Sequence, residues 1–176
     1  MSEIKIIKED ITNMDVECVV NAANEYLRAG SGVCGAIFEK AGMDELTKEC
    51  MQIGHCPTGG AAITHGFNLK AKYIIHAVGP VWYGGVERED EKLYSCYLSA
   101  LQLAQKAKIH SIAFPLISTG VFGYPKKEAW HKAIKACIDF IKENKDYDIK
   151  IVFAVINDEL LKMGEEELKL SNVDIR

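Results

Sequence analysis

The sequence predicts a single α/β domain, residues 1–176, in which helices cover both faces of a central β-sheet. Short apolar runs alternate along the chain with longer stretches whose apolar residues recur at helical spacing. Single buried strands that alternate with helices are typical of a sheet packed between two helical layers. Hydrophobic residues make up 48% of the 176 residues, so a sizeable core can form.

The first half of the chain contains four strand candidates beside a helix and a turn. Residues 4–7 (IKII) and 18–23 (CVVNAA) are predicted strands, and the second is a compact apolar run typical of a buried strand. Residues 33–41 are a predicted helix, because apolar side chains recur there at a spacing of four. Residues 61–64 and 73–77 are rich in β-forming types, and the turn-like sequence GFNLK separates them.

The second half of the chain alternates more regularly. Residues 89–108 have the apolar spacing of a long amphipathic helix, and residues 111–117 (SIAFPLI) read as a buried strand. Residues 126–144 are a second long helix with alanine and isoleucine on its apolar face. Residues 149–156 are the last predicted strand and residues 158–169 the last helix, and we expect residues 170–176 to fray.

Composition excludes several classes of protein. The formal net charge is -4, whereas a general nucleic-acid binder is expected to be basic. The six cysteines have no paired spacing, which favours reduced thiols in a cytoplasmic protein over a disulfide framework. We expect no signal peptide, because the first residues are charged, and no membrane span, because no apolar run approaches about 20 residues.

Two glycine-bearing loops follow predicted strands and precede predicted helices. Small residues let the backbone approach a ligand, and the first turn of a helix offers free amides and the positive end of its dipole. Ligands of open α/β sheets bind at the carboxyl ends of strands, so two such loops facing each other would clamp a diphosphate. The residues of these loops are Gly30, Ser31, Gly32 and Val33 in the first and Ser118, Thr119, Gly120, Val121, Phe122, Gly123, Tyr124 and Pro125 in the second.

Polar side chains stand next to this predicted clamp. Asn21 lies in the strand at 18–23 and Asn24 directly follows it, before the first glycine loop, and Asn24 is a candidate ligand residue. The alternative is that these asparagines cap a turn. Asp10 follows the first strand, and on the sequence alone it is a surface acid in a turn.

Together these residues resemble the macrodomain family. The resemblance covers roughly residues 3–170 and implies a three-layer α/β/α fold with a mixed sheet of about six strands. It also implies that the chain binds ADP-ribose, an ADP-ribosylated protein or O-acetyl-ADP-ribose, as a monomer and without a cofactor. The matching segments are residues 10–12, 20–24, 30–33, 35–37, 58–59, 75–80 and 117–123.

The resemblance also assigns roles at the two ends of the ligand. Asp10 would accept a hydrogen bond from the adenine amino group, with Ile11 contributing an amide and apolar contact. Ile156 would pack on the adenine face with Asn157 beside it, although many relatives have Phe at this position, so stacking should be weaker. At the other end, next to Ala22, Asn24 would bond the hydroxyls of the distal ribose and Phe122 would pack on that sugar.

The activity implied is hydrolysis of mono-ADP-ribosyl esters, with Asn24, Gly32 and Cys34 as candidate catalytic residues. Many relatives of the MacroD type have Asp where this chain has Cys34 and His where it has Phe38. A thiol is a poor general base at neutral pH. The segment at residues 24–27 together with Cys34 is more similar to the viral macrodomains. The alternative is a module that binds ADP-ribose without cleaving it. A third possibility is a nucleophilic Cys34, because a helix N-terminus can lower a thiol pKa.

The remaining features allow more than one interpretation. Cys50, His55 and Cys56 lack an evident fourth ligand, so we expect thiols rather than a zinc site. For His76 we expect a structural hydrogen bond. Residues 82–86 (WYGGV) would be either an exposed rim that touches a protein substrate or a loop tucked against the sheet, and the charged run at 87–92 would be a solvated helix start.

Overall fold

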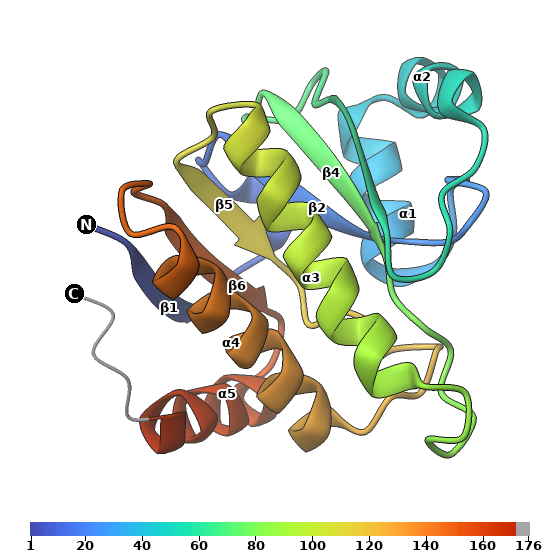
Figure 1. The fold of residues 1–176 in the computed structure, drawn as a ribbon. Coiled ribbons are helices and arrows are strands. Elements are labelled where there is room, and N and C mark those ends of the chain that lie inside the picture. Colours follow the sequence, from blue (N-terminus) through green and yellow to red (C-terminus); the bar gives the residue numbers. More distant parts are fainter. Residues whose placement is uncertain (172–176) are drawn as a thin grey trace.

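The computed structural model describes residues 1–171 and places them in three layers around one mixed sheet (Figure 1). The strand order is β1-β6-β5-β2-β4-β3. Neighbouring strands are parallel except β3, which runs antiparallel to β4 at the edge. The six-stranded α/β fold confirms the expected architecture. The strands are β1 (Glu3–Lys8), β2 (Cys18–Ala23), β3 (Ala61–His65), β4 (Tyr73–Val78), β5 (Ser111–Phe114) and β6 (Lys150–Val155).

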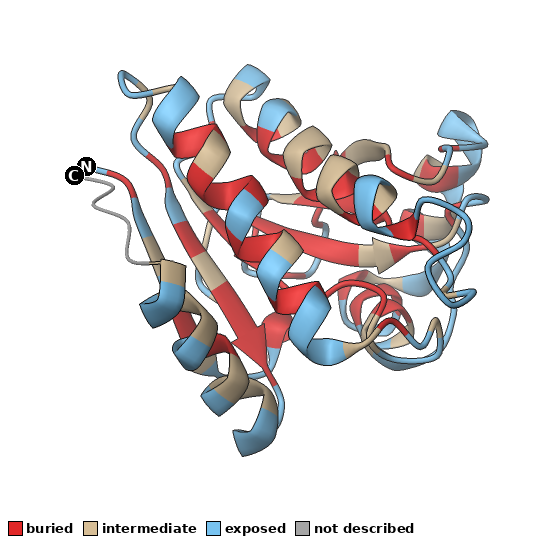
Figure 2. Ribbon diagram, turned by 60° about the horizontal axis from the view of Figure 1, so that its bottom comes forward, coloured by how far each residue is buried: buried red, intermediate tan, exposed pale blue. Residues whose placement is uncertain are grey.

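Helices cover both faces of the sheet. The helices α3 (Glu89–Lys106), α4 (Lys126–Glu143) and α5 (Asp158–Ser171) pack on one face, and α1 (Gly32–Ala41) and α2 (Met43–Ile53) pack on the other. Figure 2 shows the buried positions along the strands and along one side of each long helix. A short 3-10 helix, η1 (Ile11–Asn13), follows β1.

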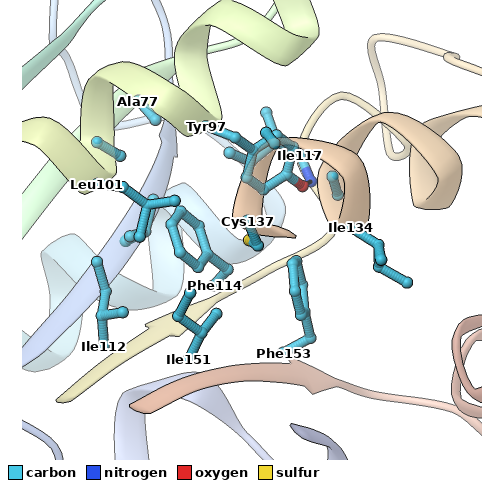
Figure 3. Close-up of a cluster of buried hydrophobic side chains, with 14 of the residues drawn as sticks. Ala77, Tyr97, Leu101, Ile112, Phe114, Ile117, Ile134, Cys137, Ile151 and Phe153 are labelled. Atoms are coloured by element: carbon cyan, nitrogen blue, oxygen red, sulfur yellow. Dashed lines mark hydrogen bonds between the residues drawn. The ribbon is translucent and has the colours of Figure 1, made fainter. Parts of the chain in front are cut away.

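The larger core lies between the sheet and the layer of α3 and α4. Figure 3 shows Tyr97 of α3 beside Phe114 of β5 and Phe153 of β6, and all three side chains are fully buried. The rings of Phe114 and Phe153 are stacked with their centroids 5.6 Å apart. Aromatic packing of this kind fixes the positions of β5 and β6, whose carboxyl ends carry two of the loops discussed below.

Two elements differ from the prediction. The strand expected at 111–117 ends at Phe114, because Pro115 has no amide hydrogen to continue the ladder. The sequence pattern did not predict α2, which follows α1 after the single residue Gly42. Only Leu46 and Cys50 of this helix are buried.

The chain ends also need one correction. Leu170 and Ser171 belong to α5 rather than to a frayed tail, and the rest of the segment expected to fray lies outside the described residues. No helix within residues 1–171 has both the length and the apolar character that crossing a bilayer requires.

Candidate ligand-binding site

A cavity of about 510 Å³ lies at the carboxyl ends of the parallel strands β2, β5 and β6. This is the edge at which open α/β sheets bind ligands. The segments that follow the three strands form its wall. The lining residues that the sequence had singled out are Ala22, Asn24, Gly30, Ser31, Gly32, Val33, Cys34, Ser118, Thr119, Gly120, Val121, Phe122, Ile156 and Asn157. Both glycine loops therefore face one space, as two halves of a clamp must.

A glycine inside α1 lets the first loop lie against the start of that helix. A β-carbon at Gly35 would stand 2.4 Å from the carbonyl oxygen of Gly30, which is far inside van der Waals contact. Gly32 has a φ of 60°, a conformation that favours glycine. The first amides of a helix have no carbonyl partner within it, and here these residues line the cavity. The main chain alone thus forms a place for an anion.

The second loop is a compact turn that follows β5. The amide of Tyr124 donates to the carbonyl of Ser118 at 2.8 Å, and the amide of Gly123 donates to Gly120 at 3.0 Å. Ser118 has a φ of 70°, a strained value for a residue with a side chain. A β-carbon at Gly79 would lie 2.3 Å from Ser118 Oγ, so the glycine after β4 makes room for this turn.

Asn24 stands in the cavity wall with its amide already oriented. Its Nδ2 donates to the carbonyl of Arg28 at 2.9 Å, and its Oδ1 accepts from the Arg28 amide at 3.1 Å. Each of these atoms can make one further hydrogen bond. The residue is both a turn-forming asparagine and a polar group available to a ligand, so the two interpretations of the sequence are compatible.

Cys34 is buried in the wall behind the first loop. Its thiol donates to the Arg28 carbonyl at 3.5 Å and accepts from Asn21 Nδ2 at 3.6 Å. Burial raises the pKa of the thiol above its ordinary value of 9.0. This rise opposes any lowering of the pKa by the helix N-terminus, and a pKa above 9.0 leaves Cys34 a neutral thiol at pH 7.

A buried polar chain supports this wall from behind. Asn21 Nδ2 lies 3.1 Å from His76 Nδ1, and His76 Nε2 lies 2.9 Å from Thr64 Oγ1. Because Asn21 Nδ2 can only donate, Nδ1 accepts from it and the ring proton is on Nε2, facing Thr64 Oγ1. His76 thus makes the structural hydrogen bonds expected for it, and burial lowers its pKa to about 4.

This histidine should make stability depend on pH. In the unfolded chain His76 takes up a proton near pH 6.5, whereas in the folded protein it does so only near pH 4. The contribution of His76 to the free energy of unfolding is therefore fully present above about pH 6.5. As the pH falls to 4, about 3 kcal/mol of this contribution is lost. Urea unfolding across this range should show a steeper loss for the protein than for His76→Gln. Parallel curves would contradict the assignment.

The nucleoside end of the predicted site is less enclosed. Asp10 and Ile11 do not line the cavity, although Glu9 donates to the carbonyl of Val155 at 3.0 Å and so keeps them at the same edge. Asp10 Oδ1 accepts from the amide and hydroxyl of Thr12, and these bonds lower its pKa. Ile11 is buried in the core.

On the other side of this end, Ile156 is 72% exposed. The Oδ1 atom of Asn157 accepts from the Leu160 amide at 2.8 Å at the start of α5. One side of an adenine ring could rest on Ile156, with the Asn157 amide nitrogen still free to donate.

Several residues of the site were not predicted. Gly79, Leu160 and Lys126 line the cavity, and Lys126 pairs with Glu159 at 3.5 Å. Gly35 and Gly79 lie in segments that match the macrodomain family, but the sequence predicted no role for either residue. A glycine directly after a buried strand, as in the sequence Val78-Gly79-Pro80, is the one signal that indicates a close backbone approach. Within residues 1–171 no three His, Cys, Asp or Glu side chains gather as metal ligands.

Comparison with other sequences identifies relatives of the whole chain. A family model described as Macro domain matches residues 20–133. A macro domain-containing protein of Listeria monocytogenes is 49% identical over 174 residues, which cover 97% of this chain and 95% of that protein.

Solved structures with the same fold contain nucleotides. The Oceanobacillus iheyensis macrodomain with ADP is 38% identical with a TM-score of 0.91, and the match covers 97% of this chain and 92% of that chain. The Trypanosoma brucei macrodomain in complex with ADP-ribose is 34% identical with a TM-score of 0.87, covering 94% of this chain and 68% of that one.

Proposed function

This chain belongs to the macrodomain family, and we propose that it binds ADP-ribose and hydrolyses mono-ADP-ribosyl esters. The substrates would be ADP-ribose esterified to Asp or Glu side chains of proteins, or O-acetyl-ADP-ribose. The observation that carries the proposal is that both glycine loops line the same cavity. Backbone amides can bind two phosphates without cationic side chains, which suits a chain with a net charge of -4.

The proposed ligand lies along the cavity from β6 to β2. Adenine would rest on Ile156, with the Asp10 carboxylate accepting from its amino group and Ile11 and Asn157 nearby. The diphosphate would lie between the two loops, residues 30–33 and 118–122. At the far end the distal ribose would pack beside Ala22 on Phe122, and Asn24 would bond its hydroxyls. The remaining hydrogen-bonding capacity of the Asn24 amide supports this arrangement.

Hydrolysis would then depend on positioning. A water held by the Gly32 loop and a substrate phosphate attacks the anomeric carbon of an ester linked there. The carbon–oxygen bond to the carboxylate breaks, and the water proton passes through the phosphate to solvent. A carboxylate leaves readily, so no strong general acid is needed. Positioning alone can lower a barrier by about 7–11 kcal/mol in favourable cases.

Cys34→Ala should retain most of the activity. The thiol is neutral at pH 7 and bonds to Asn21 and to the Arg28 carbonyl, so it contributes no base to the proposed step. We expect kcat to change less than about threefold, with some loss of stability from the cavity that the substitution leaves. Initial rates on an ADP-ribosylated protein measure this. A hundredfold fall with ADP-ribose affinity intact would make Cys34 catalytic.

The second candidate is a binding module that does not hydrolyse. The neutral thiol at position 34 favours it, because no ionised side chain faces the proposed water from that position. One pair of measurements decides between the two functions. Calorimetry with ADP-ribose tests binding, and incubation with a protein carrying mono-ADP-ribosyl esters tests release. Binding with release supports the hydrolase, binding without release supports the reader, and the absence of binding contradicts both.

A further inference from the structure

The connection between β4 and α3 is an ordered platform rather than a loose loop. Glu89, expected in a solvated helix start, is instead completely buried. Its carboxylate accepts hydrogen bonds from the amides of Tyr83 and Gly85, both at 2.8 Å, and of Glu87 at 2.5 Å. Burial raises the pKa of this carboxyl, but the backbone hydrogen bonds outweigh burial and lower the pKa overall, so the carboxylate is charged at neutral pH and fixes the loop from inside.

The same platform is fastened to the wall of the ligand cavity. The amide of Trp82 donates to the carbonyl of Phe122 at 2.8 Å, and the Trp82 ring packs on Tyr124 with centroids 4.7 Å apart. In Figure 1 the loop before α3 lies close to the loop that leads into α4. Because Phe122 is the residue assigned to the distal ribose, the platform borders the end of the cavity where the ester would project.

Apolar side chains on this platform point to solvent. Tyr83 is 63% exposed and Val86 is 78% exposed, and neither lines the ligand cavity. Val81, next to Trp82, and Val121, next to Phe122, are exposed as well. We call these four residues the rim patch. Within residues 82–86, Trp82 is thus tucked against Tyr124 while its neighbour Tyr83 is exposed.

The charged side chains next to the platform indicate what kind of molecule would cover the rim patch. A second cavity of about 500 Å³ adjoins the platform at Trp82, Gly85 and Tyr124. Its other lining side chains carry both signs, with Asp90, Glu128 and Glu167 beside Lys127 and Lys132. A nucleic acid would require a basic surface. Apolar side chains beside charges of both signs suit a polypeptide instead.

We propose that the rim patch binds the polypeptide that carries the ADP-ribosyl ester, so that this site discriminates protein-linked substrate from O-acetyl-ADP-ribose. The inference rests on the proposed function, because the ester must leave the cavity beside Phe122. The chain on either side of the modified Asp or Glu lies across Tyr83 and Val86. A fixed platform favours such contacts, since little ordering entropy is lost on binding.

The test compares two variants with paired changes. The first is Tyr83→Ser with Val86→Ser, and its matched control is Met51→Ser with Leu170→Ser, which removes side chains of 67% and 75% exposure on α2 and α5. For each, one measures the Kd for free ADP-ribose, the Kd for a mono-ADP-ribosylated protein and kcat/KM on that protein and on O-acetyl-ADP-ribose.

The rim variant should bind and cleave the modified protein about tenfold less well, with the values for ADP-ribose and O-acetyl-ADP-ribose unchanged. The control should match the parent in all four measurements. An equal loss on both substrates, or no loss on either, overturns the rim proposal while leaving the proposed function intact. If the parent protein binds no ADP-ribose, the proposed function fails and the rim proposal falls with it.

Discussion

Replacing Gly35 by alanine is expected to weaken ADP-ribose binding about 100-fold, or by about 2.7 kcal/mol. The added methyl group would start 2.4 Å from the carbonyl oxygen of Gly30, and neither backbone can yield without movement of the first glycine loop. Overpacking of this kind costs about 1–3 kcal/mol, while alanine in a helix offsets up to about 1 kcal/mol. The variant should therefore remain folded while its anion site is displaced.

Two controls separate this local effect from general damage. Circular dichroism and a thermal melt report whether Gly35→Ala is folded. Ala36→Ser, which enlarges an exposed neighbour on the same helix, should bind ADP-ribose as the parent does. If Gly35→Ala binds ADP-ribose normally, the amides of the first loop do not hold the diphosphate.

Asn24→Ala should lower kcat on an ADP-ribosyl ester about 100-fold with a much smaller change in KM. In the proposed complex the Asn24 amide bonds the distal ribose next to the attacked carbon, so its removal lets the sugar move relative to the water. A small misplacement of reacting groups is enough to reduce a rate by two orders of magnitude. Single-turnover kinetics separate the chemical step from binding and release.

ADP serves as the control ligand for this variant because it lacks the distal ribose. Asn24 also fixes the turn through Arg28, so a purely structural role would disturb the neighbouring phosphate loop and weaken ADP as well. We expect the Kd for ADP to stay within about twofold. A parallel loss of ADP affinity would make Asn24 a structural residue, and unchanged turnover would remove it from the mechanism.

The sequence pattern predicted the elements with broad apolar faces and failed where the cause was tertiary. The buried strands β2 and β6 and the long helices α3 and α4 each bury many apolar residues, so periodicity located them. The helix α2, which buries only Leu46 and Cys50, was not predicted. The burial of Glu89 could not be predicted, because three amides of its own loop offset the cost of taking a charge out of water.

In the candidate site too, the features with a local sequence signal were predicted and those with a tertiary cause were not. Glycine loops after strands are local signals, and both loops line one cavity. By contrast, the need for Gly79 depends on its contact with Ser118, and the pKa of Cys34 depends on burial that no local pattern reveals. Asn21 of β2 is hydrogen-bonded to His76 of the neighbouring strand β4. Only the register of these two strands brings the pair together.

A crystal structure of this protein with ADP-ribose tests the central claim most directly. If main-chain amides of both loops hold the diphosphate, phosphate oxygens will lie about 2.7–3.2 Å from amides in residues 30–33 and 118–122. We also expect the distal ribose beside Asn24, with a water near its anomeric carbon. A diphosphate bound by lysine side chains outside this cavity, or touching only one of the two loops, would contradict the account.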